Sequence, residues 1–206
     1  MLEINLKQDL LRVSKEMHTL GLVASTSGNV SVYNKELGIM IITPSSVSYV
    51  EMEIEDLVVL KLDGEIVSGD RKPSSEWKMH AKIYMERSEV GSVVHTHSPY
   101  ATGFAVCHIE IPVILIEMIP FIGGSALVAD FAMPGSEELG MEVLKVLKER
   151  SACLLSNHGA LSIGKDAASA LNASIYLEDA AKIYHIAKTV GQVKVLPDEI
   201  IAKMKA

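Results

Sequence analysis

Three histidines and one glutamate are the residues of this chain whose types and spacing could perform chemistry. His95 and His97 are one residue apart in the β-branched, apolar run 92–97, which predicts a strand. Alternate side chains of a strand share a face, so the two imidazoles point the same way. With His158 they would form a His₃ set with one open coordination position, the arrangement of a catalytic zinc site. An H-x-H pattern alone is more often a pair of half-buried histidines, so the surrounding motifs must decide.

The acid of this group is Glu76, which directly follows two serines at the predicted start of a helix. A helix dipole alone favours an acid in the first turn. Alternatively, the carboxylate faces the metal, as a ligand at rest and a proton acceptor once substrate displaces it. His80, four residues on, shares the same helical face and is expected to pack or to support the site. The histidines without partners at metal spacing are expected to be structural or solvated: His18, His108 and His185.

Three short loops rich in hydroxyl and amide groups lie at predicted element boundaries. They are Ser27-Gly28-Asn29, Thr43-Pro44-Ser45-Ser46 and Ser74-Ser75. Each could be a plain turn or a helix cap. Each could also present backbone N–H groups and side-chain donors to a phosphate, most clearly at the helix start. Together they could enclose one phosphate through Gly28, Asn29, Thr43, Ser74 and Ser75.

Length and composition limit the class of protein. The chain has 206 residues, of which 49% are hydrophobic and 22% charged, so we expect one globular domain over residues 1–206. The formal net charge of −7 argues against nucleic-acid binding, which needs a basic surface. Any phosphate site must therefore be built from local donors.

The sequence also favours a cytoplasmic protein without membrane contact. The N-terminus lacks the basic and apolar regions of a signal peptide. The most apolar stretch, residues 109–128, is interrupted by charges, prolines and glycines and is too broken to span a bilayer. Cys107 and Cys153 lie in apolar segments and are expected to be reduced.

The predicted elements alternate between strands and helices. Periodicity, capping residues and turns predict helices over 6–20, from the serines to about residue 87, over 136–150 and over 166–190. Strands are predicted over 29–33, 38–43, 57–62, 65–67, 92–97, 113–119, 153–155 and 160–163, with a hairpin turn at Asp63-Gly64. This order predicts an α/β fold with a mixed sheet covered by helices.

Five of these segments together resemble the class II aldolase/epimerase family, of which L-fuculose-1-phosphate aldolase is typical. They are Ser27-Gly28-Asn29-Val30-Ser31, Ile42-Thr43-Pro44, Pro73-Ser74-Ser75-Glu76-Trp77, Val94-His95-Thr96-His97 and Asn157-His158-Gly159. They occur in the family's order and with similar separations, from about residue 5 to residue 200. The combination is specific, although each segment alone is not.

The resemblance implies a three-layer α/β/α fold with a mixed, largely antiparallel sheet, and a homotetramer with active sites at subunit interfaces. It implies one Zn²⁺ per subunit on His95, His97 and His158, with Glu76 as the acid/base. The substrate would be a sugar phosphate, a ketose 1-phosphate of the L-fuculose type, cleaved to dihydroxyacetone phosphate and an aldehyde through a metal-stabilised enediolate. The residues implied for phosphate binding are Gly28, Asn29, Thr43, Ser74 and Ser75.

Two departures from the family pattern concern the aldehyde side of the pocket. The C-terminal tyrosine of the fuculose enzyme, a proton donor, has no counterpart here, which leaves the general acid open. Glu117 stands where a nearby tyrosine is expected, and it either faces solvent at a strand edge or contacts the aldehyde in a neighbouring site.

Other members of the family act on related substrates, so alternatives remain. An L-ribulose-5-phosphate 4-epimerase or a methylthioribulose-1-phosphate dehydratase could use the same metal and carboxylate. A non-catalytic module like the adducin head is a distant alternative, because all four residues of the metal and base set are present.

Overall fold

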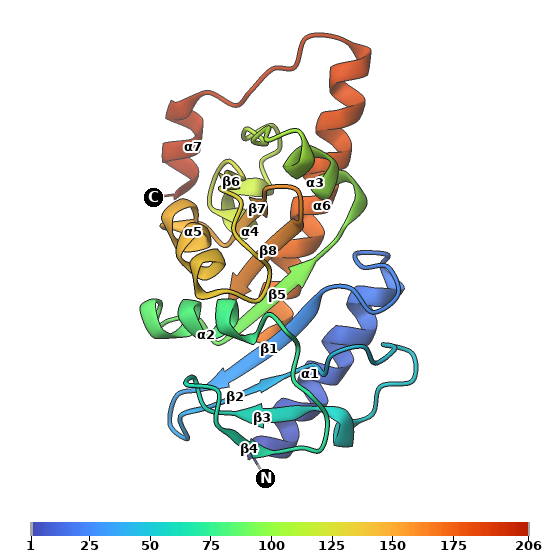
Figure 1. Ribbon diagram of the computed structural model, residues 1–206. Helices are drawn as coiled ribbons and strands as arrows, with labels where there is room; N and C mark the ends of the chain where they lie inside the picture. Colours follow the sequence, from blue (N-terminus) through green and yellow to red (C-terminus); the bar gives the residue numbers. More distant parts are fainter. Residues whose placement is uncertain (1, 206) are drawn as a thin grey trace.

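One eight-stranded sheet forms the centre of the molecule, and the computed structural model describes residues 2–205 (Figure 1). The strands lie in the order β4-β3-β2-β1-β5-β8-β7-β6, and all neighbours are antiparallel except β6 and β7. Their bounds are β1 Asn29–Asn34, β2 Ile39–Ile42, β3 Val58–Leu60, β4 Ile66–Ser68, β5 Ser92–Thr96, β6 Val128–Ala129, β7 Ala152–Leu155 and β8 Gly159–Gly164. The predicted mixed, largely antiparallel sheet is confirmed.

Helices cover both faces of this sheet and complete three α/β/α layers. One face packs against α2 (Trp77–Glu86) and α5 (Glu137–Leu147). The other face packs against four helices: α1 (Leu2–Thr19), α3 (Pro99–Val106), α4 (Met118–Ile122) and α6 (Ala167–Val190). A 3₁₀ turn (Ile54–Asp56) and α7 (Asp198–Lys205) complete the described elements. Among residues 2–205, no helix has both the length and the apolar character needed to cross a bilayer.

The alternation of side chains along β1 and β5 aims polar groups at α2. Val93 packs in the core under α2 and α5, whereas Val94 packs in the core on the opposite face. Since faces alternate along a strand, His95 lies on the side of Val93 and therefore faces α2. Val30 likewise belongs to the far core, so Asn29 and Ser31 of the neighbouring strand share the face of His95.

The predicted helix starts at residues 136 and 166 are confirmed by their caps. The Ser136 hydroxyl accepts a hydrogen bond from the N–H of Leu139 at 3.3 Å. The Asp166 carboxylate accepts one from the N–H of Ser169 at 2.7 Å. In both cases a short polar side chain satisfies a backbone donor that the first helical turn leaves free.

The start of α2 differs from the prediction of a serine cap. The helix begins at Trp77, and the capping position is Glu76, whose side chain makes no capping hydrogen bond. Ser74 instead lies in the turn before the helix, where its hydroxyl is 3.4 Å from the N–H of Glu76. The carboxylate is therefore free to face the sheet.

The predicted strand over 113–119 is wrong. Residues 113–117 form no ladder, and the chain turns at Leu115 into the short helix α4, with Pro120 in its first turn. A short apolar run cannot be assigned to strand or helix from periodicity alone, and proline is tolerated in a first helical turn. The elements α3, β6 and α7 were not predicted.

Candidate active site

His95 is held at the centre of the sheet by strands on both sides. It pairs with Asn29 of β1 and with Leu161 of β8. Its Nδ1 lies 2.9 Å from the carbonyl oxygen of Ala160, and its side chain is fully buried. A carbonyl can only accept, so Nδ1 carries the hydrogen and Nε2 presents a lone pair to the other two histidines.

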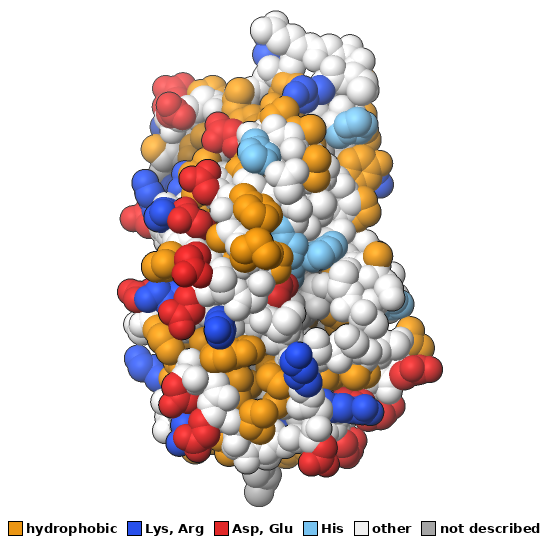
Figure 2. Space-filling model, in the orientation of Figure 1, with side chains coloured by type: hydrophobic (Ala, Val, Ile, Leu, Met, Phe, Trp, Pro, Cys, Tyr) orange, Lys and Arg blue, Asp and Glu red, His pale blue; other side chains and the backbone are white. Residues whose placement is uncertain are grey.

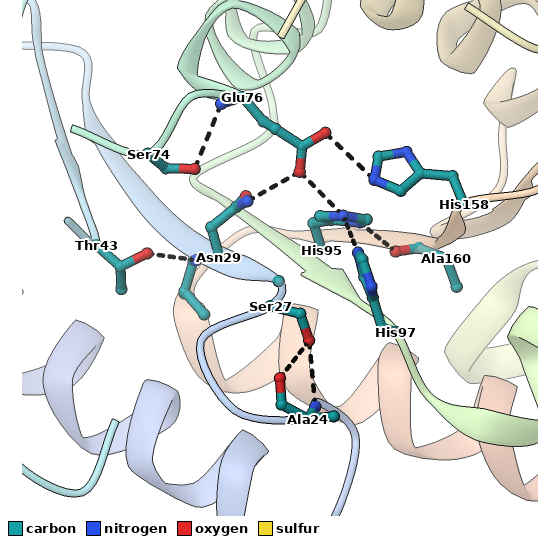
Figure 3. Close-up of polar contacts among 12 residues, drawn as sticks. Ala24, Ser27, Asn29, Thr43, Ser74, Glu76, His95, His97, His158 and Ala160 are labelled. Carbon is teal, nitrogen blue, oxygen red and sulfur yellow. Dashed lines mark hydrogen bonds and ion pairs between the residues drawn. The ribbon is translucent and has the colours of Figure 1, made fainter. Parts of the chain in front are cut away.

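The structure brings the three predicted histidines together (Figure 3). Their ligand atoms lie within 4.8 Å of one another, and Nε2 of His97 is 3.1 Å from Nε2 of His95. His158 comes from the turn between β7 and β8, and its ring centroid is 4.7 Å from that of His95. The two less buried rings, His97 and His158, are partly exposed. In Figure 2, histidine side chains reach the surface near the middle of the molecule.

The turn that presents His158 depends on its two neighbours. Asn157 has a φ of 54° at the third position of a turn closed by a hydrogen bond from the His158 N–H to the Leu155 carbonyl. Asparagine and glycine tolerate this conformation best. Gly159 is needed for space, since a methyl group there would lie 2.3 Å from the Thr96 oxygen. It would also lie 3.2 Å from ring carbons of both His95 and His97, a close approach that the sequence did not reveal.

Glu76 completes the group from the start of α2. Its Oε2 is 3.0 Å from Nε2 of His95 and accepts a hydrogen bond from the Asn29 amide at 3.1 Å. Its Oε1 is 3.5 Å from Nε2 of His158, and only 6% of the residue is exposed. The carboxylate is therefore oriented by β1 on one side and faces the histidines on the other.

The electrostatics of the group favour an ionised carboxylate at Glu76 and neutral imidazoles at His97 and His158. Burial opposes ionisation of Glu76, but His95 and then His158 outweigh it and hold the pKa of the carboxyl well below its usual range. Burial, followed by the charges of His95 and His158, lowers the pKa of His97 to about 4. Burial likewise lowers the pKa of His158, whereas for His95 the Glu76 carboxylate outweighs burial and raises the pKa.

These donors fit a divalent cation. Nε2 of His95 lies 3.1 Å from Nε2 of His97 and 3.0 Å from Oε2 of Glu76, so the lone pairs of these atoms face one small space. Among the described residues, the buried Glu76 Oε1 and His158 Nδ1 have no hydrogen-bond partner. Imidazole nitrogens with one nearby carboxylate suit zinc, and the Ala160 carbonyl orients a ring in the way that metal-binding histidines are commonly oriented.

The predicted phosphate loops meet beside Asn29 and Glu76. Residues 43–46 and 72–75 are tied by a bridge between Pro44 and Pro73, and the Ser74 N–H donates to the Thr43 carbonyl at 3.1 Å. The Thr43 hydroxyl accepts from the N–H of Val30, next to Asn29 (Figure 3). Ser75 is exposed, whereas Asn29, Thr43 and Ser74 are buried. The loops therefore share one side of the histidine group.

Tyr49 supports the loop at Gly28 and was not identified from the sequence. Its hydroxyl donates to the carbonyls of Gly28 at 2.8 Å and Ser27 at 3.1 Å. Gly28 has a φ of 73°, and a methyl group on it would lie 2.6 Å from the His95 oxygen. The loop is thus packed directly against β5, and only glycine fits.

Two other predicted positions lie apart from these contacts. His80 is fully buried, and its Nδ1 bonds to the Ser31 hydroxyl at 2.7 Å, next to Tyr84. It therefore packs α2 against β1, one of the two roles expected for it. Glu117 is exposed at the start of α4 and not on a strand, so strand alternation does not orient it. Its contact with a neighbouring site stays a prediction.

The chain is similar in sequence and in structure to aldolases and epimerases that act on sugar phosphates. The family of class II aldolases and adducin N-terminal domains matches residues 8–185. A 5-deoxy-D-ribulose 1-phosphate aldolase of Bacillus thuringiensis serovar kurstaki is 36% identical over 193 residues, which cover 94% of this chain and 90% of the relative. An L-ribulose-5-phosphate 4-epimerase of Salmonella paratyphi C is 32% identical and covers 90% of this chain and 86% of its own. The structure of an L-fuculose 1-phosphate aldolase has a TM-score of 0.93 and 37% identity, covering 98% of this chain and 94% of that one.

Proposed function

The chain belongs to the class II aldolase family, and on that premise we propose that it is a zinc-dependent aldolase for a ketose 1-phosphate. It reversibly cleaves the C3–C4 bond of the sugar to give dihydroxyacetone phosphate and an aldehyde. The observation that carries the proposal is the convergence of three imidazoles on one carboxylate beside three loops rich in hydroxyl and amide groups.

Each part of this arrangement has a role in the proposed reaction. His95, His97 and His158 hold the cation, which when bound supplies Lewis-acid stabilisation of the negative charge that develops on substrate oxygens. During cleavage the C4 hydroxyl loses its proton to solvent as the C3–C4 bond breaks, and Glu76 is the acid/base that gives a proton to C3, which keeps the electron pair; synthesis reverses both transfers. Asn29 fixes the carboxylate by its amide hydrogen bond at 3.1 Å.

The phosphate is held without a strongly basic surface. Gly28, Asn29, Thr43, Ser74 and Ser75 offer backbone N–H groups, hydroxyls and one amide close to the start of α2. A helix N-terminus stabilises an anion through its free N–H groups and its dipole, which suits a chain with a formal charge of −7.

Similarity supports deoxyketoses as the substrate class. The relative from Bacillus thuringiensis is named for 5-deoxy-D-ribulose 1-phosphate, and the structural neighbour for L-fuculose 1-phosphate. Both compounds are 1-phosphates of 2-ketoses that lack the terminal hydroxyl group. We therefore place both in the first substrate panel, ahead of fully hydroxylated sugars.

The test is a panel of ketose 1-phosphates with metal analysis on the same protein sample. Release of dihydroxyacetone phosphate is followed through NADH consumption by glycerol-3-phosphate dehydrogenase. We expect turnover that is lost on thorough chelation and restored by Zn²⁺. Full activity after chelation would contradict the proposal.

An L-ribulose-5-phosphate 4-epimerase activity is a second candidate, because the Salmonella relative, which is 32% identical to this chain, is named for it. Incubation with L-ribulose 5-phosphate separates the two, since epimerisation yields D-xylulose 5-phosphate and no dihydroxyacetone phosphate. A dehydratase acting on methylthioribulose 1-phosphate would also release none. Purified protein with neither bound metal nor turnover would favour a binding module like the adducin head.

The proposed assembly is a homotetramer with active sites between subunits. Sedimentation equilibrium measures it directly. Glu117 belongs to this proposal as a contact to the aldehyde of a neighbouring site, and a monomeric protein with full activity would exclude that role.

A further inference from the structure

His97 lies where the sheet no longer fixes the chain. The last residue of β5 is Thr96, which pairs with Ala160, whereas His95 is paired on both sides. The His97 N–H donates to the carbonyl of Leu22 at 3.1 Å, outside the ladder. Within residues 2–205, the one hydrogen-bond contact described for its ring is that with His95. The orientation of His97 therefore depends on the backbone that follows it.

That backbone enters α3 through a short, stiff connection. Ser98 is extended, with φ −62° and ψ 133°, as expected for a residue before proline. Pro99 then begins the helix and has no N–H to satisfy. The Ser98 hydroxyl is buried without a hydrogen-bond partner among the described residues and does not cap the helix. The next two N–H groups of the first turn need an acceptor from elsewhere.

Glu178 of α6 supplies both acceptors. Its Oε1 accepts from the N–H of Tyr100 at 2.9 Å, and its Oε2 accepts from the N–H of Ala101 at 2.8 Å. Among the described residues it makes no salt bridge with a lysine or arginine, so its two oxygens serve the start of α3. The ring of Tyr100 also packs on α6, 5.7 Å from the ring of His185.

The position of Glu178 links its hydrogen bonds to Tyr100 and Ala101 with the rest of the site. The helix that carries it packs on β5, which bears His95, and on β8, which follows His158. Ala101 is fully buried, so loss of the carboxylate would leave a buried N–H unsatisfied. The backbone would shift to bring this N–H to another acceptor. The nearest segment outside the hydrogen-bonded ladder of the sheet is the one that contains His97.

We propose that Glu178 is a positioning residue for His97: by holding the N–H groups of Tyr100 and Ala101, it keeps the third imidazole in the metal-binding set. The inference rests on the proposed metal site. Glu178 touches neither the cation nor the substrate in this role and acts through the backbone between residues 97 and 101.

The test measures metal affinity directly. Glu178→Gln keeps the size of the side chain but leaves one backbone N–H facing an amide NH₂ group. Zn²⁺ affinity is measured by competition with a chromophoric chelator, and the geometry by the visible spectrum of the Co²⁺-loaded protein. We expect about 10- to 100-fold weaker Zn²⁺ binding, the range typical of residues that orient metal ligands, together with an altered Co²⁺ spectrum. Asp179→Asn is the matched control, because it removes the same charge from the next residue, which is exposed. It should bind Zn²⁺ with the wild-type affinity.

A double-mutant cycle shows whether the effect passes through His97. In a His97→Ala background, Glu178→Gln should change Zn²⁺ affinity by less than about twofold. An equal loss in both backgrounds would overturn the inference, as would Glu178→Gln protein that is less stable yet binds Zn²⁺ like the wild type. If Glu178→Gln does not fold, Glu178→Asp is measured in its place under the same criteria. Wild-type protein that binds no metal would instead contradict the proposed function.

Discussion

At the scale of single residues, the site places one carboxylate among three imidazoles in a nearly buried space. Glu76 is fixed by the Asn29 amide and faces His95 and His158. Its ionised form is favoured by the two histidines although burial opposes it. An ionised carboxylate of this kind can accept a proton from a sugar carbon when a cation shares the developing charge.

Glu76→Gln should therefore remove catalysis and keep the metal. We expect kcat to fall by about 10²- to 10⁴-fold, the usual contribution of a general acid/base, because the amide cannot accept the proton. Zinc content should stay near one per chain. Steady-state kinetics and metal analysis measure both, and Glu86→Gln at the exposed end of the same helix is the control. A variant with kcat within threefold of wild type would remove Glu76 from the mechanism.

Gly159 tests how closely the backbone must approach the histidines. In Gly159→Ala the new methyl group would lie 2.3 Å from the Thr96 oxygen, so strand β8 or the rings must move. We expect Zn²⁺ affinity to fall at least about tenfold, measured by chelator competition. Gly103→Ala is the control, since a methyl group there meets nothing within 4 Å. Equal affinity in both variants would show that the site tolerates the shift.

At the scale of elements, strand alternation and helix starts place the reacting groups. The face of β5 that carries Val93 also carries His95, and the same face of β1 carries Asn29. The helix α2 crosses this face with Glu76 at its start. Loops between elements then surround the site: a side chain holds the loop at Gly28, and backbone hydrogen bonds join residues 43–46 to residues 72–75.

Tyr49 holds the loop at Ser27 and Gly28, and Tyr49→Phe tests its effect on phosphate binding. Burial raises the pKa of the hydroxyl, so it stays protonated and donates to two carbonyls. Loss of about 1 kcal/mol of hydrogen bonding should raise KM about fivefold, with a smaller effect on kcat. Inorganic phosphate should inhibit correspondingly less well.

The control for this variant is Tyr33→Phe. Tyr33 stacks on Tyr84 with ring centroids 5.0 Å apart, and no hydrogen bond of its hydroxyl is described within residues 2–205. Its kinetics should match the wild type. A Tyr49→Phe protein that is less stable but keeps the wild-type KM would limit Tyr49 to a structural role.

At the scale of the whole molecule, the site lies at the centre of the sheet, where polar groups are buried between two layers. His80 is the clearest case: burial, and then the charge of His95, lower its pKa from 6.5 to about 3. The Ser31 hydroxyl on β1 bonds both to His80 and to the hydroxyl of Tyr84, which lies on the same helix as His80, so the three side chains form one buried hydrogen-bonded group. The folded protein keeps this imidazole neutral.

This burial makes stability depend on pH. Between pH 6.5 and about 3 the unfolded chain binds a proton at this residue that the folded chain does not, so stability rises with pH across this window and is lost as the pH falls. In metal-free protein, His80→Gln should reduce the loss between pH 6.5 and 4.5 by on the order of 2 kcal/mol. Urea unfolding at several pH values measures this change. An unchanged slope in His80→Gln would contradict the role assigned to burial.

Sequence alone determined the features that depend on local order. The H-x-H pattern on a β-branched run, the glutamate at a helix start, and the caps at Ser136 and Asp166 all follow from neighbours in the chain. Periodicity therefore predicted the mixed sheet and the main helices. It failed over 113–119, because an apolar run with prolines on both sides satisfies strand and turn patterns alike.

The tertiary structure decided which of these local features meet. The Ala160 carbonyl orients His95 across 65 residues of sequence, and Glu178 holds the start of α3 across 77 and 78 residues. Gly159 is required by the Thr96 oxygen and the His95 ring on β5, and by the His97 ring just beyond this strand. Such contacts are set by strand register and by the packing of helices on the sheet. No local pattern encodes them, because each partner taken alone has the sequence of an ordinary helix, turn or strand.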